Sequence, residues 1–284
     1  MYAPRQADSV LSTFTAGDGG NLALQYWPVP EGATRRGIVV LVHGLGEHAG
    51  RYDRLAQRLV EWGYSAIGYD QVGHGDSEGV RGCLPTTLRL VDDLDDVVGS
   101  VRNRLKPGER LIVLGHSMGG LVAACWVLLR PSRIDGLVLS SPALRTDLGP
   151  VKRLLLAVLP HVAPNLRLGN SVRPEALSHD PEVVQAYKAD PLVHDRISAR
   201  LARFIVEGGA RVLSRARHWA VPTLLLYSGS DAVVNAKGSQ AFAAQAPDGV
   251  VEAHAFDDMF HEVFNELDAE PAYEALKDWL DRRS

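Results

Sequence analysis

A stretch of 19 residues without Asp, Glu, Lys or Arg, Leu111 to Leu129, constrains the fold of this chain more than any other feature. An apolar run of this length ordinarily predicts a helix that spans a membrane. At its centre, however, stands Gly115-His116-Ser117-Met118-Gly119, where glycines and polar side chains interrupt an apolar helix. A buried strand, a tight turn and a buried helix account better for the same residues. We therefore expect a soluble protein.

The remainder of the chain alternates short apolar runs with longer segments of helical period, as in a mostly parallel sheet covered by helices on both faces. The predicted strands are Val10–Phe14, Leu22–Trp27, Gly37–Val42, Tyr64–Tyr69, Arg110–Leu114, Leu137–Ser141, Val221–Tyr227 and Val250–Phe256. Gly37–Val42 is apolar throughout, the pattern of a strand that is buried on both faces. The predicted fold class is therefore α/β.

Apolar residues at helical spacing predict the helices between these strands. The helices cover Tyr52–Trp62, Leu88–Leu105, Leu121–Leu129 and Ala269–Arg282. The second of them also carries four aspartates, which we interpret as a solvated face rather than a site; they are Asp92, Asp93, Asp95 and Asp96.

The alternation stops between Leu144 and Trp219, where no run has a strand pattern. Helical period instead marks residues 151–162, 181–188 and 197–217. An insertion this long between two core strands usually has a function, and ligands bind at the C-terminal edge of open α/β sheets. We therefore predict a helical cap at 144–219 over a core formed by 1–143 and 220–284.

Composition and the first residues predict the binding partners, the thiol state and the location of the protein. The hydrophobic fraction of 46% and the charged fraction of 23% are ordinary for a globular protein. A net charge of −4 without a Lys/Arg run predicts no nucleic-acid partner. Cys83 and Cys125 fit no disulfide framework and no metal motif, so reduced thiols are expected. Residues 1–6 lack the apolar segment of a signal peptide, and we predict a cytoplasmic location.

The segment Gly115–Gly119 fits the G-x-S-x-G pattern in which a serine stands on a sharp turn between a strand and a helix. Such a turn needs small neighbours where chain crosses chain. It also places the hydroxyl at a helix N-terminus, where backbone N–H groups stabilise an oxyanion. Three matching positions occur by chance in many chains. The strand before Ser117 and the helix after it make the pattern specific, and predict Ser117 as a nucleophile.

A serine hydroxyl needs a base to accept its proton. In chains with this turn, the order is serine, acid, histidine. Asp231 and His261 each follow a late predicted strand, and are the predicted acid and base. Taken alone, Asp231 would be interpreted as a turn residue, and His261 as a helix cap or a packing residue. Their correct order with Ser117 favours catalysis, while Asp257 and Asp258 remain weaker candidates for the acid.

An oxyanion hole requires two donors. The backbone N–H groups of Met118 and of Leu45, in the loop after the third strand, are the predicted pair. His43, His48 and His74 lack the spacing of a metal-binding motif, and residues 70–77 lack both the Walker lysine and G-x-G-x-x-G. The sequence therefore implies no cofactor and no metal.

Several blocks of the chain resemble one known family. His43-Gly44-Leu45-Gly46-Glu47-His48, followed by Arg51-Tyr52, resembles the signature of the monoacylglycerol lipase and lysophospholipase group, which shares a profile with serine aminopeptidases. The other similar blocks are 70–77, 115–120, 229–231 and 260–266, and the cap matches only loosely, apart from Asp190-Pro191-Leu192. The resemblance implies an α/β-hydrolase fold, the catalytic residues Ser117, Asp231 and His261, the donors Leu45 and Met118, a mobile cap and lipid-like ester substrates.

The combined prediction is a serine hydrolase that cleaves carboxylic esters, with monoacylglycerols or similar lipid monoesters as substrates. Lysophospholipids and simple carboxylic esters are the alternatives, followed by amide or C–C bond hydrolysis and by a non-catalytic binding protein. The apolar run Leu154–Leu159 predicts a helix packed on the body of the protein. Its alternative role is an apolar acyl tunnel that makes transient contact with membranes. The oligomeric state stays open.

Overall fold

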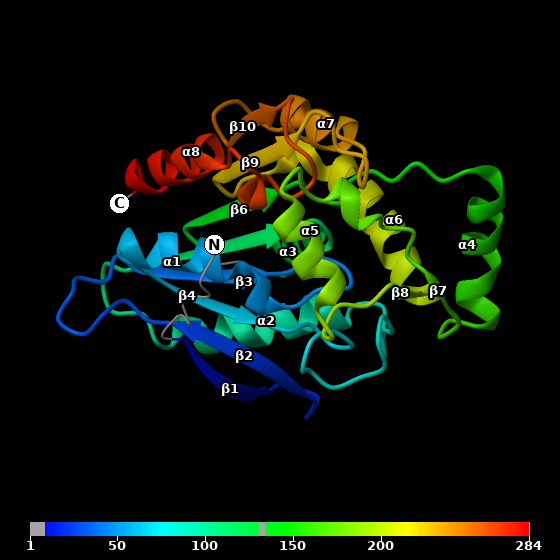
Figure 1. Cartoon of the computed structure of the whole chain (residues 1–284), viewed down its shortest axis with the longest axis horizontal. Coiled ribbons are helices and arrows are strands. Elements are labelled where there is room, and N and C mark those ends of the chain that lie inside the picture. The colour runs from blue at the N-terminus through cyan, green and yellow to red at the C-terminus, as the bar shows by residue number, and fades with distance from the viewer. Residues whose placement is uncertain (1–8, 131–133, 284) are drawn as a thin grey trace.

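A central sheet organises the computed structural model, which describes residues 9–130 and 134–283 (Figure 1). Its eight strands within these ranges run in the order β1-β2-β4-β3-β5-β6-β9-β10. β2 is antiparallel to both β1 and β4, and the remaining pairs are parallel. The strands are β1 Val10–Thr15, β2 Asn21–Trp27, β3 Gly37–Val42, β4 Tyr64–Tyr69, β5 Arg110–His116, β6 Gly136–Ser140, β9 Thr223–Ser228 and β10 Val251–Phe256.

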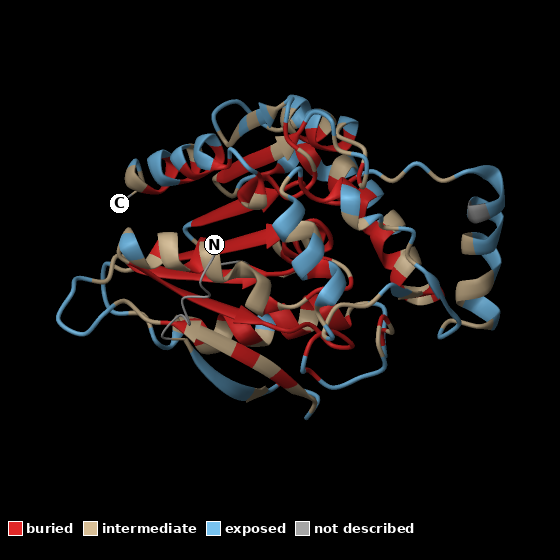
Figure 2. Ribbon diagram, viewed as in Figure 1, coloured by how far each residue is buried: buried red, intermediate tan, exposed pale blue. Residues whose placement is uncertain are grey.

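Helices cover both faces of the sheet (Figure 1). The helices of the described residues are α1 Asp53–Glu61, α2 Arg89–Arg102, α3 Met118–Leu129, α4 Pro150–Val162, α5 Pro181–Ala189, α6 Ala199–Arg215, α7 Lys237–Gln245 and α8 Glu270–Asp281, of which α4, α5 and α6 lie between β6 and β9. Because side chains alternate along a strand, Val40 packs with α2 and α3 whereas its neighbour Leu41 packs with α1 and α8. The inner strands are buried on both faces, as their continuous apolar runs predict (Figure 2).

Residues 144–219 are inserted between β6 and β9 and contain α4, α5 and α6. The prediction that this segment has no strand is wrong, because β7 Arg167–Gly169 and β8 Arg196–Ser198 form a two-stranded antiparallel sheet. Three-residue strands are too short to show an alternating pattern in the sequence. Residues 196–198 thus pair as a strand, and α6 begins only after them.

The helix predicted to pack on the body of the protein, α4, is instead largely exposed (Figure 2). It packs against α6, and none of its described residues is buried. Val151 is 69% exposed, Leu154 67% and Val162 71%. Apolar composition predicted the helix correctly, but its burial depends on a neighbour that covers only one side of it.

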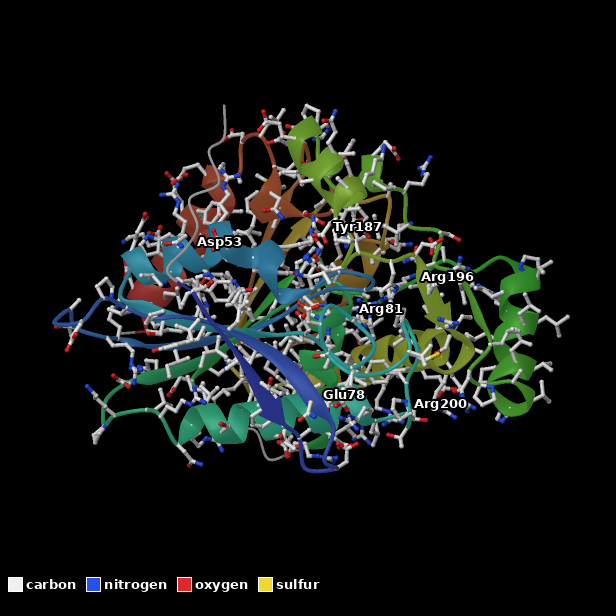
Figure 3. All side chains as sticks on the ribbon, turned by 60° about the horizontal axis from the view of Figure 1, so that its bottom comes forward. Asp53, Glu78, Arg81, Tyr187, Arg196 and Arg200 are labelled. Atoms are coloured by element: carbon white, nitrogen blue, oxygen red, sulfur yellow. The ribbon has the colours of Figure 1, made fainter. Side chains whose placement is uncertain are left out.

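Backbone hydrogen bonds attach the inserted segment to three loops of the core. The His194 N–H donates to the Gly46 carbonyl oxygen at 2.9 Å, and the Ser198 N–H donates to the Gly82 carbonyl oxygen at 2.8 Å. The Glu262 N–H donates to the Leu177 carbonyl oxygen at 2.8 Å. A side chain adds to these contacts. The guanidinium of Arg200 on α6 donates to the carbonyl oxygens of Leu84 and Pro85, in the core loop that also carries Arg81 (Figure 3).

The interpretation of the four aspartates of α2 as a solvated face is wrong in part. Asp93 is buried, and its Oδ1 accepts a hydrogen bond from Arg89 Nε at 2.6 Å. Asp95 accepts from Trp126 Nε1 at 2.8 Å, and Asp96 accepts from the Gly17 N–H at 2.7 Å. Asp95 and Asp96 thus anchor α2 to α3 and to the turn after β1, whereas the Asp93 bond lies within α2. Helical period alone does not distinguish these roles from solvation.

Other expectations concern the membrane and the chain start. Within the described ranges, no helix is both long enough and apolar enough to cross a membrane. Cys83 and Cys125 are free thiols, as predicted. The expectation about a signal peptide falls on residues 1–6, which lie outside the described residues.

Candidate active site

Ser117 stands on the tight turn between β5 and α3. Its φ of 54° lies in the left-handed region, which strains a residue that has a Cβ. The turn is so compact that a Cβ on Gly115 would overlap the Gly119 carbonyl oxygen, and a Cβ on Gly119 would overlap the Val42 carbonyl oxygen. The Ser117 N–H donates to the Ser140 carbonyl oxygen at 2.9 Å. These contacts hold the hydroxyl at the start of α3, on the C-terminal edge of the sheet.

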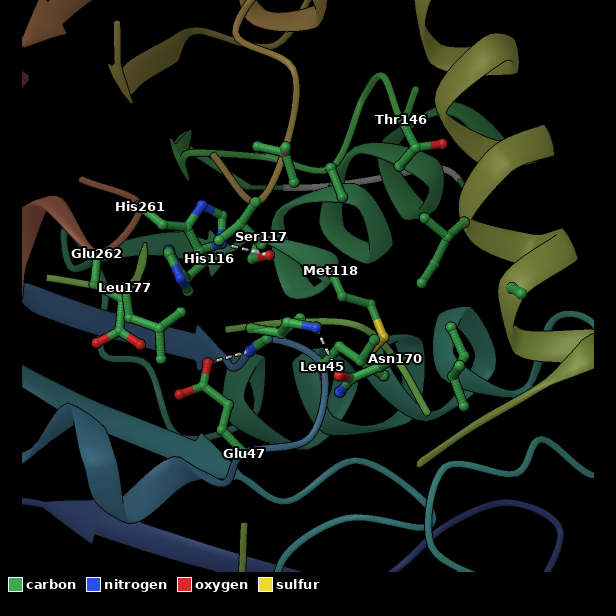
Figure 4. Close-up of a pocket in the computed structure, with 18 of the residues that line it drawn as sticks. Leu45, Glu47, His116, Ser117, Met118, Thr146, Asn170, Leu177, His261 and Glu262 are labelled. Atoms are coloured by element: carbon green, nitrogen blue, oxygen red, sulfur yellow. Dashed lines mark hydrogen bonds between the residues drawn. The ribbon is translucent and has the colours of Figure 1, made fainter. Parts of the chain in front are cut away.

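The structure places the predicted serine, histidine and aspartate in one chain of hydrogen bonds. His261 Nε2 lies 2.9 Å from Ser117 Oγ (Figure 4), and His261 Nδ1 lies 2.7 Å from Asp231 Oδ2. The His261 and Asp231 side chains are 2% and 1% exposed, so water competes little for either bond. With Nδ1 protonated toward the carboxylate, Nε2 is free to accept the serine proton. This geometry fits proton transfer from Ser117.

The surroundings keep Asp231 ionised. Burial by itself raises the pKa of this carboxyl group, but His261 and two backbone donors outweigh burial and lower the pKa below its ordinary value. The donors are the Val233 and Val234 N–H groups, 2.8 and 2.9 Å from Oδ1. His116, whose ring centroid is 4.7 Å from that of His261, has its pKa lowered to about 4 by burial and by His261. His116 is therefore neutral at pH 7 and places no positive charge beside the His261 ring.

The two predicted oxyanion donors belong to residues that border the same cavity, Leu45 and Met118. Met118 is the first residue of α3, where a backbone N–H has no acceptor within its own helix. Two hydrogen bonds to Gly44 hold the loop that carries Leu45. The Gly44 N–H donates to Glu47 Oε1 at 2.5 Å, and the Gly44 carbonyl oxygen accepts from His43 Nδ1 at 2.7 Å. Leu45 and Met118 thus both line the cavity that contains Ser117, next to backbone held by these hydrogen bonds.

The backbone next to Leu45 gives a test of the oxyanion loop. Gly46 has a φ of 78°, and a Cβ there would overlap the His194 carbonyl oxygen of the inserted segment. Gly46→Ala should therefore shift the loop and lower kcat about 10- to 100-fold for ester hydrolysis, less than full removal of an oxyanion donor. Gly32→Ala is the matched control, because Gly32 has a φ of 86° but no atom lies within 4 Å of the position that its new methyl group would take. Equal kcat values for the two variants would contradict a placed Leu45 donor.

A cavity opens at Ser117 and differs in character between its two ends. Its polar end is lined by Glu47, Arg51, Tyr187 and Glu262, and its apolar end by Leu148, Ile197, Ala202, Ile205, Val206 and Val234. A second hollow, inside the inserted segment, shares Leu148, Ile197, Ala202 and Val206 with the first and extends to α4. Figure 4 shows the carboxyl groups of Glu47 and Glu262 on one side of Ser117 and Thr146 on the other.

Sequence reasoning assigned no role to the charged residues of the polar end. Arg51 Nη1 and Nη2 each lie 2.8 Å from an oxygen of Glu262, and Nη1 also contacts Glu47 Oε2. The Tyr52 hydroxyl donates to Glu47 Oε1 at 2.8 Å. The i,i+4 spacing of Glu47 and Arg51 was an available signal. Glu262, 211 residues away in the chain, is joined to them only by the fold.

The weaker candidates for the acid lie elsewhere. Asp257 and Asp258 line a different hollow together with Glu266 and Asp268. The Asp257 carbonyl oxygen accepts a hydrogen bond at 2.6 Å from the Oγ of Ser230, the residue that precedes Asp231. The structure thus brings Asp231, and neither of its competitors, to hydrogen-bond distance of the His261 ring.

The three histidines that the sequence analysis tested for a metal motif, His43, His48 and His74, lie in structural contacts. His48 Nε2 lies 2.8 Å from Asp190 Oδ2 of the inserted segment, and the His74 ring packs between those of His43 and His194, at 5.3 and 4.8 Å. Among residues 9–130 and 134–283, no three or more His, Cys, Asp or Glu side chains are grouped as a metal site.

A mostly parallel sheet with a serine on the turn after β5, and an acid and a histidine on the loops after β9 and β10, defines the α/β-hydrolase class. The predicted fold class is confirmed. The chain belongs to the family described as Serine aminopeptidase, S33, which matches residues 33–268. This match confirms the resemblance inferred from the motif blocks.

Individual relatives carry more specific names. The chain is 36% identical over 248 residues to a monoacylglycerol lipase of Mycolicibacterium smegmatis, covering 86% of this chain and 88% of that protein. It is 29% identical to Phospholipase YtpA of Bacillus subtilis, over 86% of this chain and 95% of that protein. The crystal structure of Paleococcus ferrophilus monoacylglycerol lipase is 33% identical, with a TM-score of 0.83, over 93% of this chain and 99% of that one.

Proposed function

We propose that this chain hydrolyses carboxylic esters of lipids, monoacylglycerols above all, through an acyl-enzyme formed on Ser117. The observation that carries the proposal is the hydrogen-bonded series from Ser117 Oγ through His261 to Asp231, set where the polar and apolar ends of the cavity meet. The monoacylglycerol lipases among the relatives support the substrate class.

In this mechanism His261 acts first as a base and then as an acid. Its Nε2 takes the hydroxyl proton as Ser117 Oγ attacks the ester carbonyl carbon. The resulting oxyanion accepts hydrogen bonds from the Leu45 and Met118 N–H groups. When the tetrahedral intermediate collapses, the bond to the alcohol breaks and His261 protonates the leaving oxygen. Water then attacks the acyl-enzyme by the same steps, while Asp231 stabilises the imidazolium.

The two ends of the cavity give each half of a monoester its place. The apolar end continues into the hollow beneath α4, which suits an acyl chain because burial of each methylene contributes about 0.8 kcal/mol. The polar end, at Glu47, Arg51 and Glu262, suits the hydroxyl groups of the alcohol. The scissile carbonyl then lies between them at Ser117.

We also propose that residues 144–219 act as a cap over a hydrolase core formed by 1–143 and 220–284. The exposed apolar side chains of α4 would make transient contact with a membrane surface and collect substrate there. A flotation assay with phospholipid vesicles tests this contact, and a protein that stays entirely at the bottom of the gradient contradicts it. The cytoplasm stays our prediction for its location, in keeping with two free thiols.

A substrate panel tests the function. We expect the highest kcat/KM for monoacylglycerols, compared with lysophospholipids and peptide arylamides of matched concentration. A higher value for lysophospholipids would support the second candidate, which the B. subtilis phospholipase relative favours. Preferred cleavage of arylamides would overturn ester hydrolysis as the main activity. Failure of a fluorophosphonate to label Ser117 would point to a non-catalytic protein.

A further inference from the structure

The polar end of the cavity contains a buried group of three charged side chains, Glu47, Arg51 and Glu262, which we name the Glu–Arg–Glu group. Their side chains are 4%, 11% and 5% exposed, so bulk water screens them weakly. Two carboxylates face one guanidinium, which leaves one negative charge without a matching positive charge. A substrate alcohol at this end of the cavity meets that excess charge.

Arg51 has little capacity left to attract an anion. Both of its terminal nitrogens bond to Glu262, one of them also contacts Glu47, and the guanidinium lies 4.7 Å from the centroid of the Tyr187 ring, against which it packs. A phosphate that approached Arg51 would have to displace a carboxylate already bound in a two-pronged arrangement. Such arrangements are among the strongest that arginine forms in proteins.

Glu47 keeps its negative charge in this setting. Burial acts to raise the pKa of Glu47, but Arg51, His116 and His43 together with the Gly44 N–H outweigh it and lower the pKa to about 2. Glu262 Oε2 is held in place by a hydrogen bond from the Asn265 amide at 2.8 Å.

The surrounding residues do not reverse the sign. His116 is neutral at pH 7, because burial and His261 lower its pKa to about 4. Asp190 of the inserted segment, whose Oδ2 lies 2.8 Å from His48 Nε2 of the core, interacts electrostatically with Arg51 and adds a further carboxylate. Asp190 has a lowered pKa: its burial opposes ionisation, but His48 and the Leu192 N–H favour it. The polar end is therefore a negative environment.

We propose that the Glu–Arg–Glu group makes this enzyme select against esters whose alcohol carries a negative charge, with Glu262 as the residue that sets this selectivity. This inference rests on the proposed function, because it assumes that the alcohol occupies the polar end. It assigns the site to uncharged, hydroxyl-bearing head groups and excludes phosphate-bearing ones of the same acyl chain. It thereby separates the two lipid substrates that the fold and the relatives leave open.

The size of the effect follows from Coulomb's law. Two unit charges several ångströms apart, at the effective dielectric constant of about 20 that describes protein sites, change a binding equilibrium about 10- to 100-fold. We expect the wild-type kcat/KM for a 1-monoacylglycerol to exceed that for the lysophosphatidic acid of the same acyl chain by at least this factor. Comparable values for the two lipids would overturn the proposal without any variant.

Glu262→Gln tests the residue itself, because it removes one negative charge and keeps the shape of the side chain. We expect the ratio of kcat/KM values, neutral over anionic lipid, to fall about tenfold or more relative to the wild type. The ratio is measured within one protein sample, so it does not depend on the folded fraction. Glu61→Gln is the matched control, since Glu61 is 63% exposed on α1 and should leave the ratio unchanged. A purely structural role for Glu262 would lower both values equally and overturn the proposal.

A second pair of substrates separates this inference from the proposed function. It consists of two aryl butyrates, one with a neutral phenol and one with a sulfonated phenol as the leaving alcohol. Their intrinsic reactivities cancel when Glu262→Gln is compared with the wild type. If neither lipid is cleaved but the variant gains selectively on the sulfonated ester, the lipid assignment fails and the charge selection stands. If the variant leaves the aryl ratio unchanged, the charge selection fails.

Discussion

Ser117→Ala is expected to lose about 10⁴- to 10⁶-fold in kcat on short p-nitrophenyl esters while it keeps the native fold. The reason is that the acyl-enzyme cannot form without Oγ, and the remaining donors and cavity supply only the residual catalysis of a bound substrate. The lost hydroxyl accounts for one hydrogen bond, the 2.9 Å contact with His261 Nε2. Circular dichroism and the thermal midpoint should therefore stay close to those of the wild type.

Ser141→Ala is the matched control for this loss. Ser141 is also a buried serine with a positive φ, 41°, and it also follows a strand of the parallel sheet, β6. Its Oγ has no hydrogen-bond partner among the described residues, so its removal should change kcat less than about threefold. Full activity in Ser117→Ala, or an equal loss in both variants, would contradict the assignment of Ser117 as nucleophile.

The elbow around Ser117 could be predicted because its constraints are local. A glycine at 115 and at 119 is required by backbone that lies within a few residues or on the adjacent strand. The turn is flanked by the apolar residues Leu111–Leu114 of β5 and by the apolar helix α3. Continuous apolar runs likewise predicted the inner strands, since a strand buried on both faces has no polar alternation. For the turn at Ser117 and for the inner strands, the residues that impose the structure therefore lie close together in the sequence or form a continuous apolar run, so the sequence alone predicts them.

The inserted segment could be located from sequence but not described in detail. Its place follows from the break in alternation after β6, whereas β7 and β8 are too short to have a pattern. The exposure of α4 depends on which helices cover it, and among the elements of the described residues only α6 packs along it to a substantial extent. Helical period in a sequence shows that an apolar face exists, but not what covers that face.

The charged residues show a second limit of sequence reasoning. The contact between Arg51 and Glu262 joins positions 211 residues apart. The hydrogen bond of Asp93 to Arg89 is buried, although the sequence pattern of that helix predicts that its aspartates face solvent. A charge pattern does not reveal burial. The partner of a carboxylate can be identified only from the three-dimensional structure. For the same reason, order along the chain alone left Asp257 and Asp258 as candidates for the acid.

Asp231→Asn distinguishes the acid from those candidates, and we expect it to lower kcat about 10⁴-fold, as the same exchange does in serine proteases. The physical reason lies in the tautomer of His261. Asp231 Oδ2, 2.7 Å from Nδ1, keeps the ring proton on Nδ1 and leaves Nε2 free to accept from Ser117. An amide whose NH₂ group faces Nδ1 favours the other tautomer, in which Nε2 carries the proton and cannot act as a base.

Asp257→Asn and Asp258→Asn are the matched controls, and each should retain kcat within about threefold, because both residues line a hollow apart from the cavity at Ser117. The same three variants, measured for the rate of fluorophosphonate labelling, report on activation of Ser117 without any contribution from leaving-group protonation. Slow labelling in Asp231→Asn alone is the expected pattern. A loss in Asp257→Asn as large as that in Asp231→Asn would transfer the role of the acid, because the 2.7 Å contact would then have no catalytic consequence.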